Sequence, residues 1–109
     1  VREPIPTLML SNSHRAAILA AFKTIARQIA GDGVTLNTIL PGLIATDRAF
    51  SNHGGSREAA QAAAAESVPA GRLGEVEELA AVAVFLCSER ASYVTGTAVL
   101  VDGGRTRSI

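Results

Sequence analysis

The chain has 109 residues, which allows at most one domain, and its 10 basic and 10 acidic side chains give a formal net charge of zero. A neutral chain without a basic cluster has no general electrostatic attraction for nucleic acid, and its longest apolar run, Leu79–Cys87, is too short to cross a bilayer, so neither nucleic acid nor a membrane is expected as a partner. The single cysteine excludes an internal disulfide and argues against a metal site, and it predicts a reducing, cytoplasmic location.

The first third of the chain predicts a loop followed by a long helix. Residues 1–6 are expected to form a loop, because Pro4 and Pro6 disfavour helix and bias their neighbours toward extended backbone. The run Ser11-Asn12-Ser13 is a helix-start signal, with Ser11 as a candidate cap. The helix is expected to end near Ala30, because the glycines of Gly31-Asp32-Gly33 accept the left-handed conformation of a helix end.

The rest of the chain alternates apolar strands with helices. Val34–Leu40 and Thr97–Val101, each followed by a turn sequence, predict two buried strands. Arg57–Glu66 is alanine-rich and predicts a helix, and so does Glu75–Ser88, whose acidic first turn complements the helix dipole. This alternation is typical of an α/β fold with a parallel sheet covered on both faces. Two strands do not form a stable sheet by themselves, so the pattern predicts further strands upstream.

One side of the predicted first helix is apolar, and it comprises Ile18, Phe22, Ile25 and Ile29. At about 100° per residue, Ser11 and Arg15 project onto the N-terminal end of that side, whereas Lys23 and Arg27 point toward water. Buried polar groups need partners, which a binding site at the edge of the sheet would supply. Two structural alternatives stay open: Ser11 only caps the helix, and Arg15 forms a surface ion pair.

Four sequence blocks, in this order and at these spacings, resemble the short-chain dehydrogenase/reductase family, and bacterial 3-oxoacyl-[acyl-carrier-protein] reductase-like members in particular. The blocks are Ser11–Ala17, Gly33–Thr46, Gly71–Ala80 and Val94–Gly104. The resemblance implies a doubly wound parallel sheet of the Rossmann type, with residues 1–109 as its C-terminal half. In that family the Gly-rich phosphate loop lies in the N-terminal half, and this sequence does not contain it.

The resemblance also implies a catalytic pair at the start of the first helix. The family has Tyr-x-x-x-Lys there, in which Tyr exchanges a proton with the substrate and Lys holds the nicotinamide ribose. This sequence has Ser11 at the Tyr position and Arg15 at the Lys position. A serine hydroxyl is a weaker acid than a phenol, and arginine keeps its charge but does not relay a proton. The replacements therefore favour retained binding over retained chemistry.

Cofactor-binding residues are implied after the first strand. The turn Pro41-Gly42-x-Ile44-x-Thr46 matches the family's docking site for the nicotinamide carboxamide, and Arg15 matches the ribose contact. The turn follows a parallel strand, where doubly wound folds bind ligands. An ordinary strand-to-loop exit is the alternative. Three further matches, Asn37, Arg72 and Asp102, are expected to be structural hydrogen-bonding residues, and Cys87 a core residue.

The resemblance implies an oxidoreductase that transfers hydride between NAD or NADP and a carbonyl or alcohol substrate, with 3-oxoacyl thioesters as one candidate class. Two alternatives stay open: a catalytically degenerate dinucleotide-binding relative, and an inactive truncated fragment. A homo-oligomer is expected. Because the phosphate loop is missing from this sequence, the 109 residues alone are expected not to bind the cofactor measurably.

Overall fold

The structure, a computed structural model, describes residues 2–108, so Val1 of the predicted N-terminal loop lies outside it. The elements in chain order are α1 (Met9–Ile29), the short 3-10 helix η1 (Ala30–Asp32), β1 (Thr38–Pro41), α2 (Asp47–Asn52), α3 (Arg57–Ser67), α4 (Val76–Leu86), η2 (Glu89–Ala91) and β2 (Ala98–Val101). The two strands pair in parallel, with Thr38 opposite Ala98 and Pro41 opposite Val101. The predicted α/β class and the parallel pairing are confirmed.

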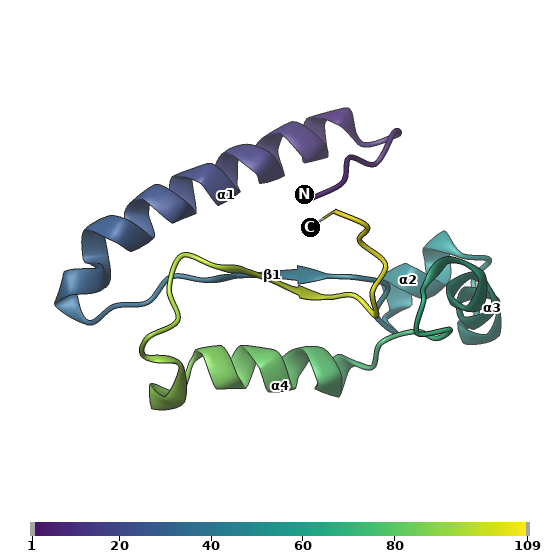
Figure 1. Ribbon diagram of the computed structural model, residues 1–109. Coiled ribbons are helices and arrows are strands. Elements are labelled where there is room, and N and C mark those ends of the chain that lie inside the picture. The colour runs from purple at the N-terminus through teal and green to yellow at the C-terminus, as the bar shows by residue number, and fades with distance from the viewer. Residues whose placement is uncertain (1, 109) are drawn as a thin grey trace.

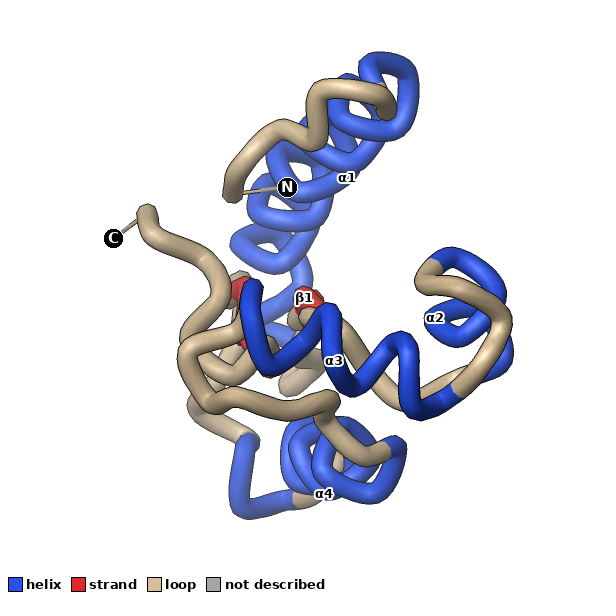
Figure 2. The backbone as a smooth tube through the Cα atoms, turned by 90° about the vertical axis from the view of Figure 1, so that its right-hand side faces the viewer, coloured by secondary structure: helices blue, strands red, loops and turns tan. Residues whose placement is uncertain are grey.

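The helices lie in layers about the strand pair. Helix α1 runs along one side of the strands and α4 along the other, while α2 and α3 lie beyond the ends of the strands (Figure 1). The view along the strands in Figure 2 shows the same three layers. Because α1 runs in the direction opposite to β1, its N-terminal turns lie over the carboxyl end of the strand (Figure 1). No helix within residues 2–108 is long and apolar enough to cross a membrane.

Helix α1 and strand β1 both begin at residues other than the predicted ones. Helix α1 begins at Met9 with Leu8 at its N-cap, so the prediction of Ser11 as the cap is wrong. Asn12 instead holds the preceding loop, because its side-chain amide exchanges hydrogen bonds of 3.2 and 2.8 Å with the backbone of Ile5. The helix end is as predicted, with Gly33 left-handed at φ 75°. Strand β1 begins at Thr38 rather than Val34, since pairing with β2 defines only its second half.

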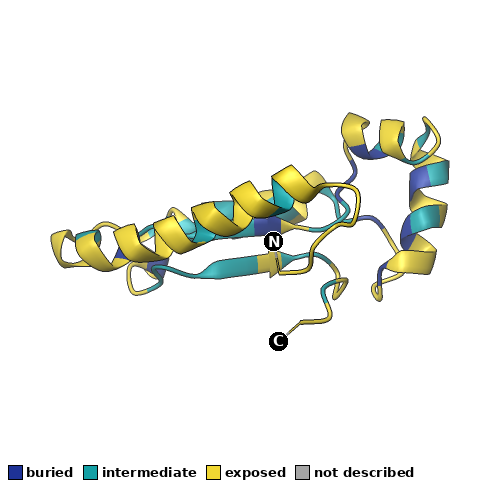
Figure 3. Cartoon of the chain, turned by 90° about the horizontal axis from the view of Figure 1, so that it is seen from above, coloured by how far each residue is buried: buried dark blue, intermediate teal, exposed yellow. Residues whose placement is uncertain are grey.

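The predicted buried face of α1 is largely open to solvent (Figure 3). Ile18 is 48% exposed and Ile25 40% exposed, and Ala26 is the helix's buried residue. Lys23, which was predicted to point toward water, donates a 2.8 Å hydrogen bond to the carbonyl of Gly96. The strand pair is too narrow to cover a 21-residue helix, and in the C-terminal half of α1 Lys23 and Ala26 lie against Gly96 in the loop before β2.

The main apolar cluster lies beyond the strand ends rather than within the sheet. It comprises Ala45, Ala60, Ala64, Val68 and Leu73, with Leu43 and Phe50 packed against it. Side-chain caps position its helices: Thr46 accepts from the Ala49 amide at the start of α2, and Ser56 does the same for α3. Cys87, predicted in the core, is exposed at the end of α4, so that prediction is wrong.

Candidate functional site

Ser11 and Arg15 form a direct pair on α1. Ser11 is the third residue of the helix and half-buried, and Arg15 follows one turn later. The Arg15 Nε atom donates a 3.0 Å hydrogen bond to the Ser11 Oγ atom. Ser11 is therefore not the helix cap, and the partner of Arg15 is a hydroxyl rather than a carboxylate. The pair leaves the Ser11 hydroxyl proton and the Arg15 Nη groups available for an outside acceptor.

Arg15 shares a cavity with the end of the first strand. The cavity has a volume of about 160 Å³ and is lined by Arg15, Ile18, Leu19, Thr38, Ile39, Leu40 and Pro41. Apart from Arg15 and Thr38, its side chains are apolar. The structure thus brings Arg15, one member of the predicted catalytic pair, into one cavity with Pro41, the first residue of the predicted cofactor turn; Ser11 does not line this cavity.

The Pro41–Thr46 turn is held from two sides. Gly42 donates a 2.9 Å hydrogen bond to the carbonyl of Val101, and an added Cβ at Gly42 would lie 2.5 Å from the Asp102 Cα atom. Ile44 is buried and forms a parallel bridge with Gly74. The Thr46 hydroxyl caps α2. Ile44 therefore lies against the Gly74 loop before α4 and Thr46 lies at the start of α2, whereas Pro41 and Gly42 remain at the strand end. The predicted turn residues are thus not brought together on one surface.

A second cavity at the strand end was not predicted from the sequence. Its volume is about 330 Å³, and it is lined by Glu3, Pro4, Ile5, Pro6, Pro41, Gly42, Asp102, Arg105 and Thr106. The Asp102-Gly103-Gly104 run indicates a turn, but no local pattern shows that residues 3–6 face it. Within residues 2–108, no group of three or more His, Cys, Asp or Glu side chains is arranged to hold a metal ion.

The three predicted structural residues all hold backbone in place. Asn37 donates a 2.8 Å hydrogen bond to the Val94 carbonyl and accepts one from Thr97 N. Asp102 accepts from the amides of Gly104 and Thr106, both at 2.9 Å. Hydrogen bonding from Thr106 holds the pKa of Asp102 below its usual value. Asn37 thereby joins the residue before β1 to the residues before β2, and Asp102 fixes the turn that follows β2.

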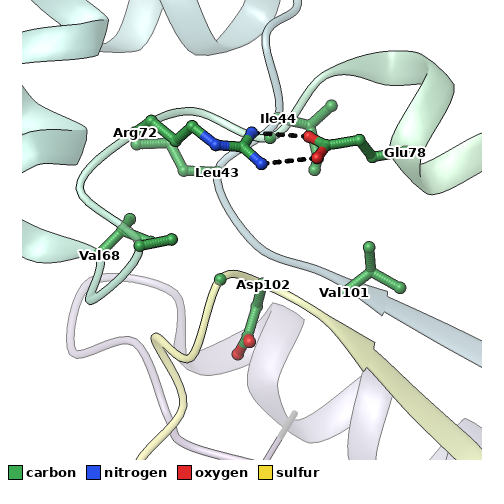
Figure 4. Close-up of a pocket in the computed structure, with 10 residues that line it drawn as sticks. Leu43, Ile44, Val68, Arg72, Glu78, Val101 and Asp102 are labelled. Atoms are coloured by element: carbon green, nitrogen blue, oxygen red, sulfur yellow. Dashed lines mark hydrogen bonds and ion pairs between the residues drawn. The ribbon is translucent and has the colours of Figure 1, made fainter.

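Arg72 and Glu78 form a two-bond ion pair beside the turn (Figure 4). The two Arg72 Nη atoms donate to the two Glu78 carboxylate oxygens at 2.8 and 2.6 Å. Glu78 Oε2 also accepts from the backbone N–H of Glu75, which completes the capping box of α4. Hydrogen bonding from Arg72 first, and then from the Glu75 amide, lowers the pKa of Glu78 to about 2. The pair and the capping box join the Arg72–Gly74 loop, which bridges to Ile44, to the start of α4.

The Glu78 contacts predict a stability loss in acid. Because the folded-state pKa of Glu78 lies below its ordinary value of 4.5, the pair stabilises the fold above that pH and the stabilisation is lost as pH falls from 4.5 toward 2. We expect Glu78→Gln to remove part of this dependence, so its urea midpoint falls less than that of the unmodified protein over this window. Glu77→Gln, the same change at the neighbouring exposed position, serves as control. Equal acid dependence in all three proteins would contradict the prediction.

Comparison with known proteins places this geometry in a family. A family model described as enoyl-(acyl carrier protein) reductase matches residues 2–106. The NADPH-dependent reductase BacG of Bacillus subtilis (strain 168) is 37% identical over 115 residues, which cover 99% of this chain and 44% of that protein. The 3-oxoacyl-[acyl-carrier-protein] reductase FabG of Vibrio harveyi is 42% identical over 90 residues, which cover 83% of this chain and 35% of that protein.

Structural comparison agrees with the sequence matches. The crystal structure of YwfH, an NADPH dependent reductase involved in bacilysin biosynthesis, superposes with a TM-score of 0.89 at 39% identity, over 99% of this chain and 44% of that one. The chain spans less than half the length of these relatives. With its parallel strands between helical layers and the matches over nearly all its residues, the chain belongs to the short-chain dehydrogenase/reductase family.

Proposed function

We propose that the protein containing this chain is an oxidoreductase that transfers hydride between NADP(H) or NAD(H) and a carbonyl or alcohol substrate. The observation that carries this proposal is the Ser11–Arg15 pair, of which Arg15 shares a cavity with Pro41, the first residue of the Pro41–Thr46 turn. Relatives named as NADPH-dependent reductase and 3-oxoacyl-[acyl-carrier-protein] reductase support it. A 3-oxoacyl thioester is therefore one substrate class to test.

The side chains at this site fit a nicotinamide nucleotide. The donor groups of the Arg15 guanidinium suit ribose hydroxyls, and the exposed Pro41 ring offers an apolar surface to an aromatic ring. We assign Pro41, Gly42, Ile44 and Thr46 to the carboxamide end. When bound, the cofactor supplies or accepts the hydride, and the chain's residues orient the reacting groups.

Ser11 and Arg15 are proposed to act on the substrate oxygen. Because Ser11 Oγ already accepts from Arg15 Nε, its hydroxyl proton is free to be donated to a carbonyl oxygen. Arg15 keeps its positive charge throughout and stabilises the negative charge that develops on that oxygen. Ser11 thus donates its proton to the substrate oxygen. Arg15 positions Ser11 by donating to its Oγ atom, and it supplies the positive charge.

The chain is proposed to form the C-terminal half of one doubly wound domain. Its sheet has two strands, and the α1 side chains Ile18, Phe22 and Ile25 are 36–48% exposed. The relatives' additional length would supply the strands that pair with β1 and cover this face. A homo-oligomer in the cytoplasm is part of the proposal. The exposed Val84 and Phe85 of α4 support the oligomer, and the presence of a single cysteine in the sequence supports the location.

The test is cofactor consumption by the full-length protein. Purified protein is mixed with NADPH or NADH and a panel of ketones, sugars and 3-oxoacyl thioesters, and loss of the reduced cofactor is followed by absorbance. We expect substrate-dependent oxidation of one cofactor. Tight cofactor binding without oxidation across the panel would instead favour the catalytically degenerate binder, which the replacement of the family's Tyr and Lys by Ser11 and Arg15 makes the second candidate.

A further inference from the structure

The cavity of about 330 Å³ at the strand end is lined by a positively charged side chain, Arg105, which has no role in the proposed hydride transfer. The cavity lies between the N-terminal loop Glu3–Pro6, the strand end Pro41–Gly42 and the C-terminal tail from Asp102 to Thr106. Ligands of doubly wound sheets bind beyond the carboxyl ends of strands. Because Pro41 and Gly42 also belong to the proposed nicotinamide turn, a molecule in this cavity would lie beside the cofactor, where the substrate must be.

Both carboxylates that line the cavity are already bound by backbone amides. Glu3 Oε1 accepts from the amides of Arg107 and Ser108, at 2.6 and 3.1 Å. Asp102 accepts from the two amides described above. Arg105 is the third charged residue of the lining, and over the part of the chain that the structure describes its guanidinium has no hydrogen-bond or ion-pair partner. The cationic group is therefore the one that can receive a charged ligand.

Two anchors fix the backbone on either side of Arg105. Asp102 accepts 2.9 Å hydrogen bonds from the amides of Gly104 and Thr106, the two residues that flank Arg105, and Glu3 accepts from the amides of Arg107 and Ser108. The second anchor joins segments more than 100 positions apart in the sequence, and Figure 1 shows the two ends of the chain near each other. A guanidinium on a fixed backbone loses less conformational freedom on binding than one on a free tail.

We propose that Arg105 binds a carboxylate group of the substrate, so that the protein acts on carbonyl compounds that carry a carboxylate. This proposal rests on the proposed hydride transfer and names its substrate class. The planar guanidinium donates two parallel hydrogen bonds that match the two oxygens of a carboxylate. The walls formed by Pro4, Ile5, Pro6 and Pro41 would contact the hydrocarbon part of such a substrate.

The experiment uses the full-length protein with 4-oxopentanoate and its methyl ester, which differ in the carboxylate charge. Each is tested as a substrate and for its effect on the fluorescence of bound NADPH. Arg105→Met removes the charge but keeps an apolar side chain of similar reach. Arg107→Met makes the same change two residues along the same tail, outside the cavity lining, and keeps the amide that Glu3 binds.

We expect kcat/KM for the acid to exceed that for the ester by about tenfold, in line with one charged hydrogen-bonded contact. Arg105→Met should remove this preference and Arg107→Met should keep it. Reduction of acid and ester at equal rates, or a preference that survives Arg105→Met, would overturn the Arg105 proposal while leaving the hydride transfer supported. If neither the acid nor the ester is reduced, the hydride transfer is not supported for these two compounds, and the fluorescence of bound NADPH tests the carboxylate site by itself. A fluorescence change that only the acid causes, and that only Arg105→Met removes, supports the site. The absence of such a change overturns the proposal for Arg105.

Discussion

Replacing Ser11 by alanine is expected to lower kcat of the full-length protein by about 10²-fold, the lower range for loss of a positioned proton donor. The reason is geometric: Ser11 Oγ is fixed by the 3.0 Å hydrogen bond from Arg15 Nε, so its hydroxyl proton has a defined direction. Removing the hydroxyl also frees the guanidinium that Ser11 positions. Turnover per folded molecule, measured with saturating cofactor, is the decisive quantity.

Ser13→Ala is the matched control for this change. Ser13 lies on the same helix, two residues later, and its Oγ donates a 3.0 Å hydrogen bond to the Met9 carbonyl. It is exposed, so its loss should leave turnover unchanged. Neither serine is the helix cap, so both variants should differ little in the free energy of unfolding. Equal turnover in Ser11→Ala and Ser13→Ala would show that Ser11 takes no part in the reaction.

Two Arg15 variants distinguish the role of the positive charge from the role of the planar guanidinium donors. Arg15→Met should lower turnover and raise the cofactor dissociation constant, because both the charge and the ribose donors are lost. Arg15→Lys keeps the charge and restores the family's residue, but it lacks the planar set of donors that reaches Ser11. We expect it to recover cofactor affinity more fully than turnover. If the double variant Ser11→Tyr with Arg15→Lys has the same turnover as the unmodified protein, this pair has no catalytic role.

Replacing Gly42 by alanine is expected to lower the free energy of unfolding by about 1–3 kcal/mol, the usual cost of forcing an extra group into a packed site. The added Cβ would lie 2.5 Å from the Asp102 Cα atom and 2.7 Å from its Cβ atom. These two Asp102 atoms are part of, or bonded to, the backbone that directly follows β2. To make room for the added Cβ, the end of β1 must therefore move away from the end of β2. The hydrogen bond from Gly42 N to the Val101 carbonyl would lengthen as a result.

Gly31→Ala is the control, because no atom lies within 4 Å of its added Cβ. That change should be neutral or slightly stabilising, since alanine restricts the unfolded chain more than glycine does. Denaturant titration of both variants measures the difference. A Gly42→Ala protein as stable as Gly31→Ala would show that the close approach of the turn to Asp102 does not constrain this position.

Local spacing and the alternation of strands and helices could be predicted from the residues alone. The i, i+4 spacing of Ser11 and Arg15 placed them one helical turn apart, and their hydrogen bond follows from that spacing. The apolar strands separated by helices indicated parallel pairing, which the paired strands confirm. Asn37 and Arg72, expected to be structural because they match the family, do hold backbone: Asn37 donates to the Val94 carbonyl and Arg72 to the Leu73 carbonyl.

The contacts between distant segments could not be predicted from the residues and come from the folded arrangement. Lys23 bonds to Gly96 and Glu3 to Arg107, over separations of 73 and 104 residues. No periodic pattern encodes such pairs, because they depend on where each layer crosses the next. The exposed α1 face has the same cause: helical periodicity identifies an apolar side, but burial requires a neighbouring layer, and two strands cover only part of it. The cavity beside Arg105 arises for this reason too, where the loop, the strand end and the tail converge.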